Sequence, residues 1–106
     1  MKVEILYVAG CPAYFETLRR IRQALAAEGV AANIRDVLVA DSRVAEHLRF
    51  PGSPTIRIDG SDITNGAENP QISLSCRIYA GSDASPVPPI ETIRRAIAEA
   101  RRKSRS

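Results

Sequence analysis

Residues 3–25, VEILYVAGCPAYFETLRRIRQAL, organise the rest of the chain. The stretch begins with six mostly apolar residues, which predict a short strand covered on both faces. After Gly10, large apolar side chains recur at spacings of three and four, as on an amphipathic helix whose outer side carries arginines. Cys11 is therefore expected between the end of a strand and the start of a helix. The apolar stripe of this helix comprises Phe15, Leu18, Ile21 and Leu25.

The position of Cys11 favours a chemical role for its thiol. Pro12 suits the first position of the helix, because proline has no N–H group to leave unpaired there. The first amides of a helix are unpaired and its dipole is positive at this end, so both stabilise a nearby anion. A thiolate should therefore form readily at Cys11. The alternative is that Cys11 is a small residue that packs, half-buried, into a tight turn.

The composition is that of one soluble domain. Of the 106 residues, 44% are hydrophobic and 25% are charged. No segment approaches the ~20 apolar residues that a membrane span requires, and the N-terminus lacks the features of a signal peptide. We therefore expect no membrane association and a cytoplasmic location, where cysteines are more often reduced or catalytic than structural.

The formal net charge of +3 is concentrated at the C-terminus, where four basic residues lie in the last six positions. Without these four charges the remainder carries −1. We predict a single domain over residues 1–100 and a basic tail over residues 101–106, which is the solvated end of a final helix. No aromatic residues alternate with the basic ones, so specific nucleic-acid binding is not expected.

The remaining segments alternate between strand and helix patterns in the order β-α-β-α-β-β-α. A helical crossover between the first two strands implies that they are parallel. Asp59-Gly60 predicts a turn, and the polar residues 61–71 predict a loop. The expected fold class is α/β, with a four-stranded mixed sheet flanked by helices. The strands are expected at 3–8, 30–39, 55–59 and 72–79, and the helices at 12–28, at 41–48 with Asp41 as the N-cap, and at 89–100.

Two features together resemble the thioredoxin superfamily in its small, glutaredoxin-sized form. One is the cysteine at the start of the first helix, and the other is the Ser-Pro-Thr that opens the third strand. The segments GCP (10–12), FPGSPTIRIDG (50–60) and LSCRIY (74–79) are similar to a small group of bacterial thioredoxin-like, or DF-family, proteins, some of which carry selenocysteine at the position of Cys11. This resemblance covers nearly the whole chain and implies a thioredoxin-like fold.

The resemblance also implies a substrate-binding set around the third strand. In the family, the proline that begins this strand is cis and lies beside the active-site cysteine, and Pro54 occupies the matching position. A cis bond would leave the Ser53 backbone free to pair with an extended substrate or a glutathione-like peptide. Thr55 follows in the same segment. Tyr14 either donates a hydrogen bond to a bound sulfur or oxygen, or simply covers the first turn of the helix.

The chain departs from the family's redox motif at one position. The tetrad is CPAY (11–14), whereas a dithiol thioredoxin has a second cysteine at the last position and a monothiol form usually has serine. An adjacent resolving thiol is therefore missing. Cys76 lies on the apolar face of the predicted 72–79 strand and is either a buried core thiol or a distant resolving cysteine. Thr17 stands where a cysteine-dependent phosphatase loop needs arginine, which argues against that activity.

We expect a thiol-dependent redox protein in which Cys11 attacks a disulfide, a peroxide or another electrophile. The expected function is that of a thiol–disulfide oxidoreductase or a peroxide or electrophile reductase. The partner would be a small thiol or disulfide-containing substrate, with glutathione or another thiol as co-substrate and no further cofactor. The candidate catalytic residues are Cys11, Pro12, Pro54 and Cys76, and the candidate substrate-binding residues are Ser53, Tyr14 and Thr55.

Two alternatives remain open. The first is the handling of soft metals or organomercurials by Cys11 and Cys76, because thiolates suit such metals and relatives of the resembling group are described as alkylmercury lyase-like. The second is a non-catalytic interaction module with the same fold. His47 has no cysteine or histidine at ligand spacing, so no metal site is expected from it. The apolar edge of the 30–39 strand would allow a homodimer.

Overall fold

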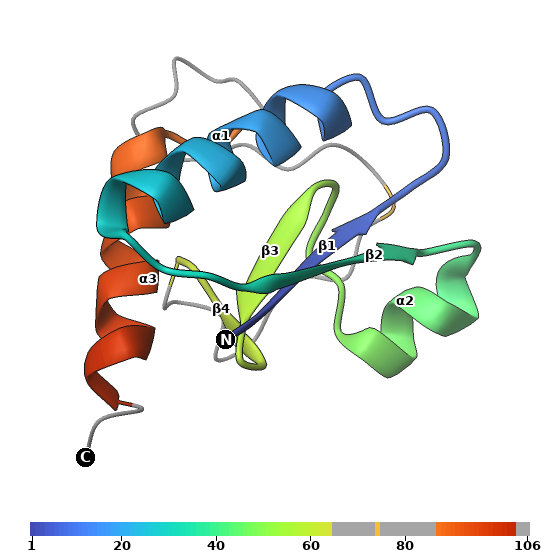
Figure 1. The fold of residues 1–106 in the computed structure, drawn as a ribbon. Coiled ribbons are helices and arrows are strands. Elements are labelled where there is room, and N and C mark those ends of the chain that lie inside the picture. The colour runs from blue at the N-terminus through green and yellow to red at the C-terminus, as the bar shows by residue number, and fades with distance from the viewer. Residues whose placement is uncertain (65–73, 75–86, 104–106) are drawn as a thin grey trace.

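The computed structural model describes residues 1–64, 74 and 87–103. Within these residues the element order is β-α-β-α-β-β-α (Figure 1), but its fourth strand is not the 72–79 strand that the sequence predicts. None of the described helices is long and apolar enough to cross a membrane. The strands are β1 (Lys2–Tyr7), β2 (Asn33–Leu38), β3 (Thr55–Ile58) and β4 (Ser61–Asp62), and the helices are α1 (Tyr14–Glu28), α2 (Ser42–Leu48) and α3 (Ile90–Lys103).

The four strands form one mixed sheet in the order β2-β1-β3-β4. β1 is parallel to β2, as the helical crossover predicts, and antiparallel to β3. The register places Leu6 opposite Thr55, so the last residues of β1 and the first residue of β3 lie at the same end of the sheet. This topology brings the turn with Cys11 and the loop with Pro54 to the same end of the molecule.

The central strand β1 is covered on both faces, as predicted for its apolar run. Val3 and Ile5 are fully buried in a core beneath α1 and α3. Leu6 points to the opposite face and is buried in a second, smaller core against α2. Figure 1 shows this layering, with α1 and α3 on one side of the sheet and α2 on the other. The smaller core comprises the buried residues Leu6, Val39, Ala45 and Phe50.

The first helix begins two residues later than predicted. Pro12 lies in a turn, Ala13 is the N-cap without a side-chain hydrogen bond, and α1 starts at Tyr14. The apolar stripe shifts accordingly: Tyr14 packs against the larger core, whereas Phe15 is 79% exposed. Placing Phe15 on the buried stripe was therefore wrong, because in the first turn of the helix the neighbouring Tyr14 covers the sheet.

The fourth described strand is not the one that the sequence predicts. Asp59 and Gly60 have φ angles of 49° and 87° and form a two-residue hairpin turn, so residues 61–62 fold back on β3 instead of beginning a loop. The predicted 72–79 strand lies outside the described residues except for Leu74, which is in a bend and 41% exposed.

The helix ends follow their local signals. Asp41 Oδ1 accepts a hydrogen bond from Val44 N at 3.0 Å, as an N-cap of α2 should. Gly29 ends α1 in a left-handed conformation with φ of 65°, which glycine adopts without steric cost. The final helix α3 continues to Lys103, so basic residues of the predicted tail form its last turn.

Candidate functional site

Cys11 is a half-buried, free thiol in the turn between β1 and α1. Its N–H donates to Val8 O at 3.2 Å, and its carbonyl oxygen accepts from Tyr14 N at 3.3 Å. Gly10 has a φ of 76°, in the left-handed region that allows the chain to reverse after the strand. The backbone on both sides of Cys11 is therefore held by hydrogen bonds.

The start of α1 offers donors beside Cys11. The N–H groups of Phe15 and Glu16 have no hydrogen-bond partner among the described residues. These amides and the helix dipole favour a negative charge at this end of the helix. Thr17 is fully buried in the second turn, and its hydroxyl also lacks a partner within the described part of the chain. The unpaired amides therefore lie in the first turn of α1, which begins three residues after Cys11.

A buried serine connects the Cys11 turn to the loop before β3. Ser53 and Pro54 are buried, and the peptide bond between them is cis, as the resemblance implies. Ser53 Oγ accepts a hydrogen bond from Val8 N at 3.2 Å, while Val8 O accepts from Cys11 N. Val8 is thus the link that brings the two sequence motifs together. Ser53 is predicted as a substrate-binding residue, and this structural role of its hydroxyl is not apparent from the sequence.

Replacing Ser53 by alanine should destabilise the fold by about 1–3 kcal/mol, because the part-buried Val8 amide would lose its acceptor. The free energy of unfolding, measured with denaturant, tests this. Ser42→Ala is the matched control, since Ser42 is exposed at the start of α2 and should change stability by less than about 0.5 kcal/mol. Equal effects of the two substitutions would contradict the structural role of the Ser53 hydroxyl.

Further hydrogen bonds hold the loop before β3 and the end of α2 in place. Thr55 is fully buried, and its hydroxyl donates to Gly52 O at 2.7 Å. Arg57, on β3, donates to Leu48 O at 2.6 Å and to Arg49 O at 3.3 Å, which joins the end of α2 to the sheet. The hydroxyl of Thr55, another predicted substrate-binding residue, therefore supports the loop from inside.

Tyr14 faces strand β2. Its hydroxyl donates to Asp36 Oδ1 at 2.6 Å. Its ring lies between those of Tyr7, 4.6 Å away between centroids, and Phe15, 5.1 Å away. Sequence reasoning missed Asp36 and Tyr7, although the predicted parallel pairing of their strands indicated that the ends of both strands lie near the start of α1.

The hydrogen bond to Asp36, helped by partial burial and by the negative charge of Asp36, raises the pKa of Tyr14 from 10.0 to about 12. The hydroxyl therefore keeps its proton at neutral and mildly alkaline pH. Because the folded-state pKa is the higher one, this contribution to stability is complete below pH 10 and is lost as the pH rises towards 12.

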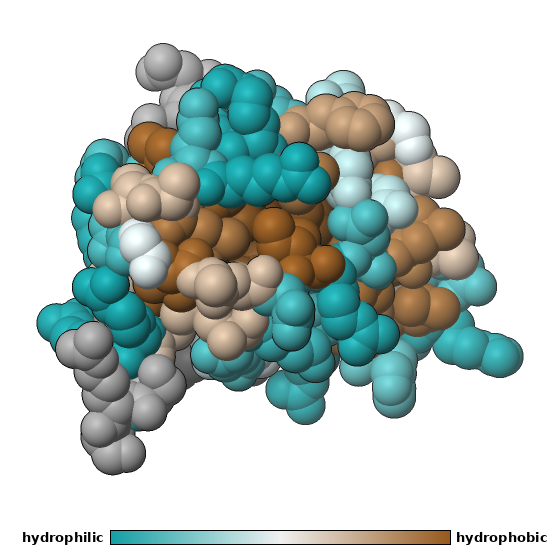
Figure 2. Space-filling view, viewed as in Figure 1, coloured by the Kyte–Doolittle hydropathy of each residue, from teal (hydrophilic) through white to brown (hydrophobic). Residues whose placement is uncertain are grey.

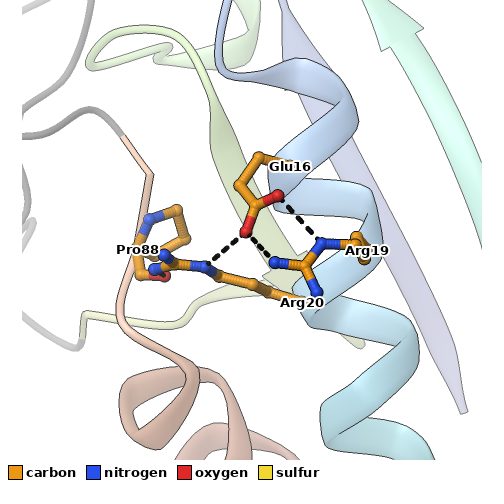
Figure 3. A network of polar contacts seen from close by, with 4 residues as sticks. All are labelled: Glu16, Arg19, Arg20 and Pro88. Carbon is orange, nitrogen blue, oxygen red and sulfur yellow. Dashed lines mark hydrogen bonds and ion pairs between the residues drawn. The ribbon is translucent and has the colours of Figure 1, made fainter.

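Two of the arginines on α1, Arg19 and Arg20, are paired with Glu16. Glu16 accepts hydrogen bonds from Arg19 and Arg20, and Arg20 also donates to Pro88 O at 2.9 Å (Figure 3). The hydrogen bond from Arg19 is the main reason that the pKa of Glu16 is lowered. Arg20 thereby fixes the segment before α3 to the first helix.

The exposed surface at this end of the molecule is partly apolar. Phe15 is 79% exposed at the start of α1, and Leu38 is 49% exposed at the end of β2. On the face shown in Figure 2, apolar side chains form a band between α1 and β2, bordered by hydrophilic residues. Leu38 pairs with Tyr7 in the sheet, so this exposed leucine lies beside the strand end that leads to Cys11.

A pocket of about 280 Å³ lies at the opposite end of the sheet, between the β3–β4 hairpin and α3. Its lining includes Ile58, which pairs with Val3 near the start of β1, far along the strand from Cys11. Among the described residues, no group of three or more histidine, cysteine, aspartate or glutamate side chains is placed to hold a metal ion. His47 is exposed on α2.

The described structure gathers six of the seven candidate residues at one end of the sheet: Cys11, Pro12, Tyr14, Ser53, Pro54 and Thr55. Cys76 lies outside the described residues. No protein-family model, curated protein or solved structure matches the chain.

Proposed function

We propose that this chain is a thiol-dependent redox protein of thioredoxin-like type in which Cys11 is the nucleophile. The observation that carries the proposal is the hydrogen-bonded connection from Ser53 Oγ through Val8 to Cys11 N. It connects the turn of a strand-exit cysteine, three residues before a 15-residue helix, to the loop that contains Pro54. The strand order β2-β1-β3-β4 is compatible with this assignment.

The chemistry is thiol–disulfide exchange. The Cys11 thiolate attacks one sulfur of a disulfide, so a new S–S bond forms while the old one breaks, and the leaving thiolate takes up a proton. An external thiol such as glutathione, as its thiolate, then attacks the substrate-derived sulfur of this mixed disulfide. Cys11 leaves as a thiolate, and the external thiol ends in a new disulfide. One thiol is consumed and one is released in each cycle.

An external thiol is proposed because position 14 holds no second cysteine. Tyr14 occupies the position at which a dithiol protein has its resolving cysteine, and its hydroxyl donates a hydrogen bond to Asp36. Pro12 would direct the chain from the Cys11 turn into α1. The loop at 53–54 would present its backbone to the substrate beside the sulfur, which is the role that the family resemblance suggests.

The proposal is tested on the wild-type protein by site-resolved mass spectrometry. The protein is alkylated with iodoacetamide over a range of pH, and in parallel it is incubated with oxidised glutathione. We expect Cys11 to be alkylated faster and at lower pH than a cysteine in an unstructured peptide, and to form the mixed disulfide with glutathione.

Other outcomes separate the alternatives. If Cys11 has the reactivity of an ordinary thiol and forms no mixed disulfide, the redox proposal fails and the interaction module takes its place. Tight retention of Hg²⁺ that requires both Cys11 and Cys76, without catalysed exchange, would overturn it in favour of soft-metal handling.

A further inference from the structure

One side chain connects the Cys11 turn to the edge of the sheet. The Tyr14 N–H donates to Cys11 O at 3.3 Å, so the residue that begins α1 also closes the turn. At its other end, the Tyr14 hydroxyl donates to Asp36 Oδ1 on β2, 22 residues along the chain. The backbone of Cys11 and strand β2 are therefore held by the two ends of the same residue.

The Tyr14 ring is held between these two ends. It packs at 4.6 Å and a tilt of 44° against Tyr7, the last residue of β1, and edge-on against Phe15. Tilted and edge-on pairs are favourable arrangements of aromatic rings. Strand β1, which carries Tyr7, is paired with β2, which carries Asp36, so both contacts are made to neighbouring strands of the same sheet.

The hydroxyl proton of Tyr14 is donated to Asp36 in a short hydrogen bond. A hydrogen bond of 2.6 Å from a hydroxyl to a carboxylate lies in the range of strong, charge-assisted bonds. A phenol has one proton, so the group that donates to Asp36 does not donate to a substrate sulfur at the same time. The raised pKa of Tyr14 agrees with a proton held firmly below pH 10.

We propose that Tyr14 and Asp36 form a tether that positions the Cys11 turn against β2, and that Tyr14 is a positioning residue and not a proton donor to the substrate. The inference rests on the proposed function of Cys11. It assigns roles to two residues that the exchange reaction itself does not require, and it predicts that loosening the tether weakens the setting in which the Cys11 thiolate is held.

The experiment is a double-mutant cycle with Tyr14→Phe and Asp36→Ala, read by the rate and pH profile of Cys11 alkylation. Each single variant should slow alkylation at neutral pH about threefold to tenfold and shift its pH profile to higher pH, because each removes the same hydrogen bond. The double variant should be no slower than the slower single variant. Asp36→Asn keeps an acceptor for the hydroxyl and should restore most of the rate lost in Asp36→Ala.

Tyr7→Phe is the matched control, since the Tyr7 hydroxyl makes no hydrogen bond with the described residues. It should leave the Cys11 rate unchanged. Where wild-type Cys11 reacts faster than an unstructured thiol, additive losses in the double variant, or single variants with wild-type rates, would overturn the tether. Thermal unfolding of every variant separates a local effect from a global one.

Failure of the proposed function has a different signature. In that case Cys11 of the wild-type protein is alkylated no faster than a cysteine in an unstructured peptide, and the substitutions do not lower this rate further. The hydrogen bond is then tested by following tyrosinate absorbance as the pH is raised. In Asp36→Ala the pKa of Tyr14 should fall from about 12 towards 10. An unchanged titration would refute the tether independently of any chemistry at Cys11.

Discussion

Cys11→Ser is expected to abolish thiol–disulfide exchange, with a loss of roughly three orders of magnitude or more. A thiolate is the attacking group in this reaction, whereas a serine hydroxyl is not ionised at neutral pH and forms no disulfide. The substitution should leave the fold intact, because the turn is held by the backbone of Cys11 through Val8 and Tyr14. The measurement is glutathione-dependent reduction of a mixed disulfide between glutathione and a peptide.

Cys76→Ser is the matched control for this experiment. With an external thiol as resolving partner, this variant should retain the exchange activity. If instead it still forms the mixed disulfide at Cys11 but no longer turns over, Cys76 is the resolving thiol. Full activity in Cys11→Ser would refute the nucleophile assignment, whatever the behaviour of Cys76.

Phe50→Ala should lower the free energy of unfolding by about 3–5 kcal/mol, because the substitution leaves a cavity under the sheet. Phe50 is fully buried in the smaller core, which has four buried members. Its N–H also bonds to Ala45 O at 2.9 Å, at the end of α2 and just before the loop that contains Ser53. Such a loss is a large share of the about 5–15 kcal/mol that stabilises a typical domain. Denaturant-induced unfolding gives the value.

Phe15→Ala makes the same chemical change on the surface. Phe15 is 79% exposed and contacts the ring of Tyr14 edge-on, so its loss should change the free energy of unfolding by no more than about 1.5 kcal/mol. Phe50→Leu provides a milder variant if Phe50→Ala does not fold. Similar stabilities for Phe50→Ala and Phe15→Ala would show that the smaller core does not hold α2 to the sheet.

Much of the fold follows from short-range patterns. Hydrophobic periodicity is a local property, so the apolar run of β1 and the order of the elements from β1 to β3 are readable from neighbouring residues. Asp41 as a cap and Gly29 as a helix end depend on their own backbone conformation and nearest amides. The turn at Asp59-Gly60 is also a local feature and was predicted. The strand that follows it was not predicted, because residues 61–71 are mostly polar and resemble a loop.

The amino-acid sequence alone was therefore sufficient for the α/β class, the parallel first pair of strands and the choice of Cys11 as a candidate. Tertiary packing alone determined which groups surround Cys11, since Ser53 lies 45 residues from Val8 and Asp36 lies 22 residues from Tyr14. Packing also turned Tyr14 inward and left Phe15 exposed, although both are aromatic neighbours at the start of one helix. The physical reason is that a hydrogen bond or ring contact between distant residues depends on the register of the sheet and the placement of helices on it. No local pattern encodes these relations.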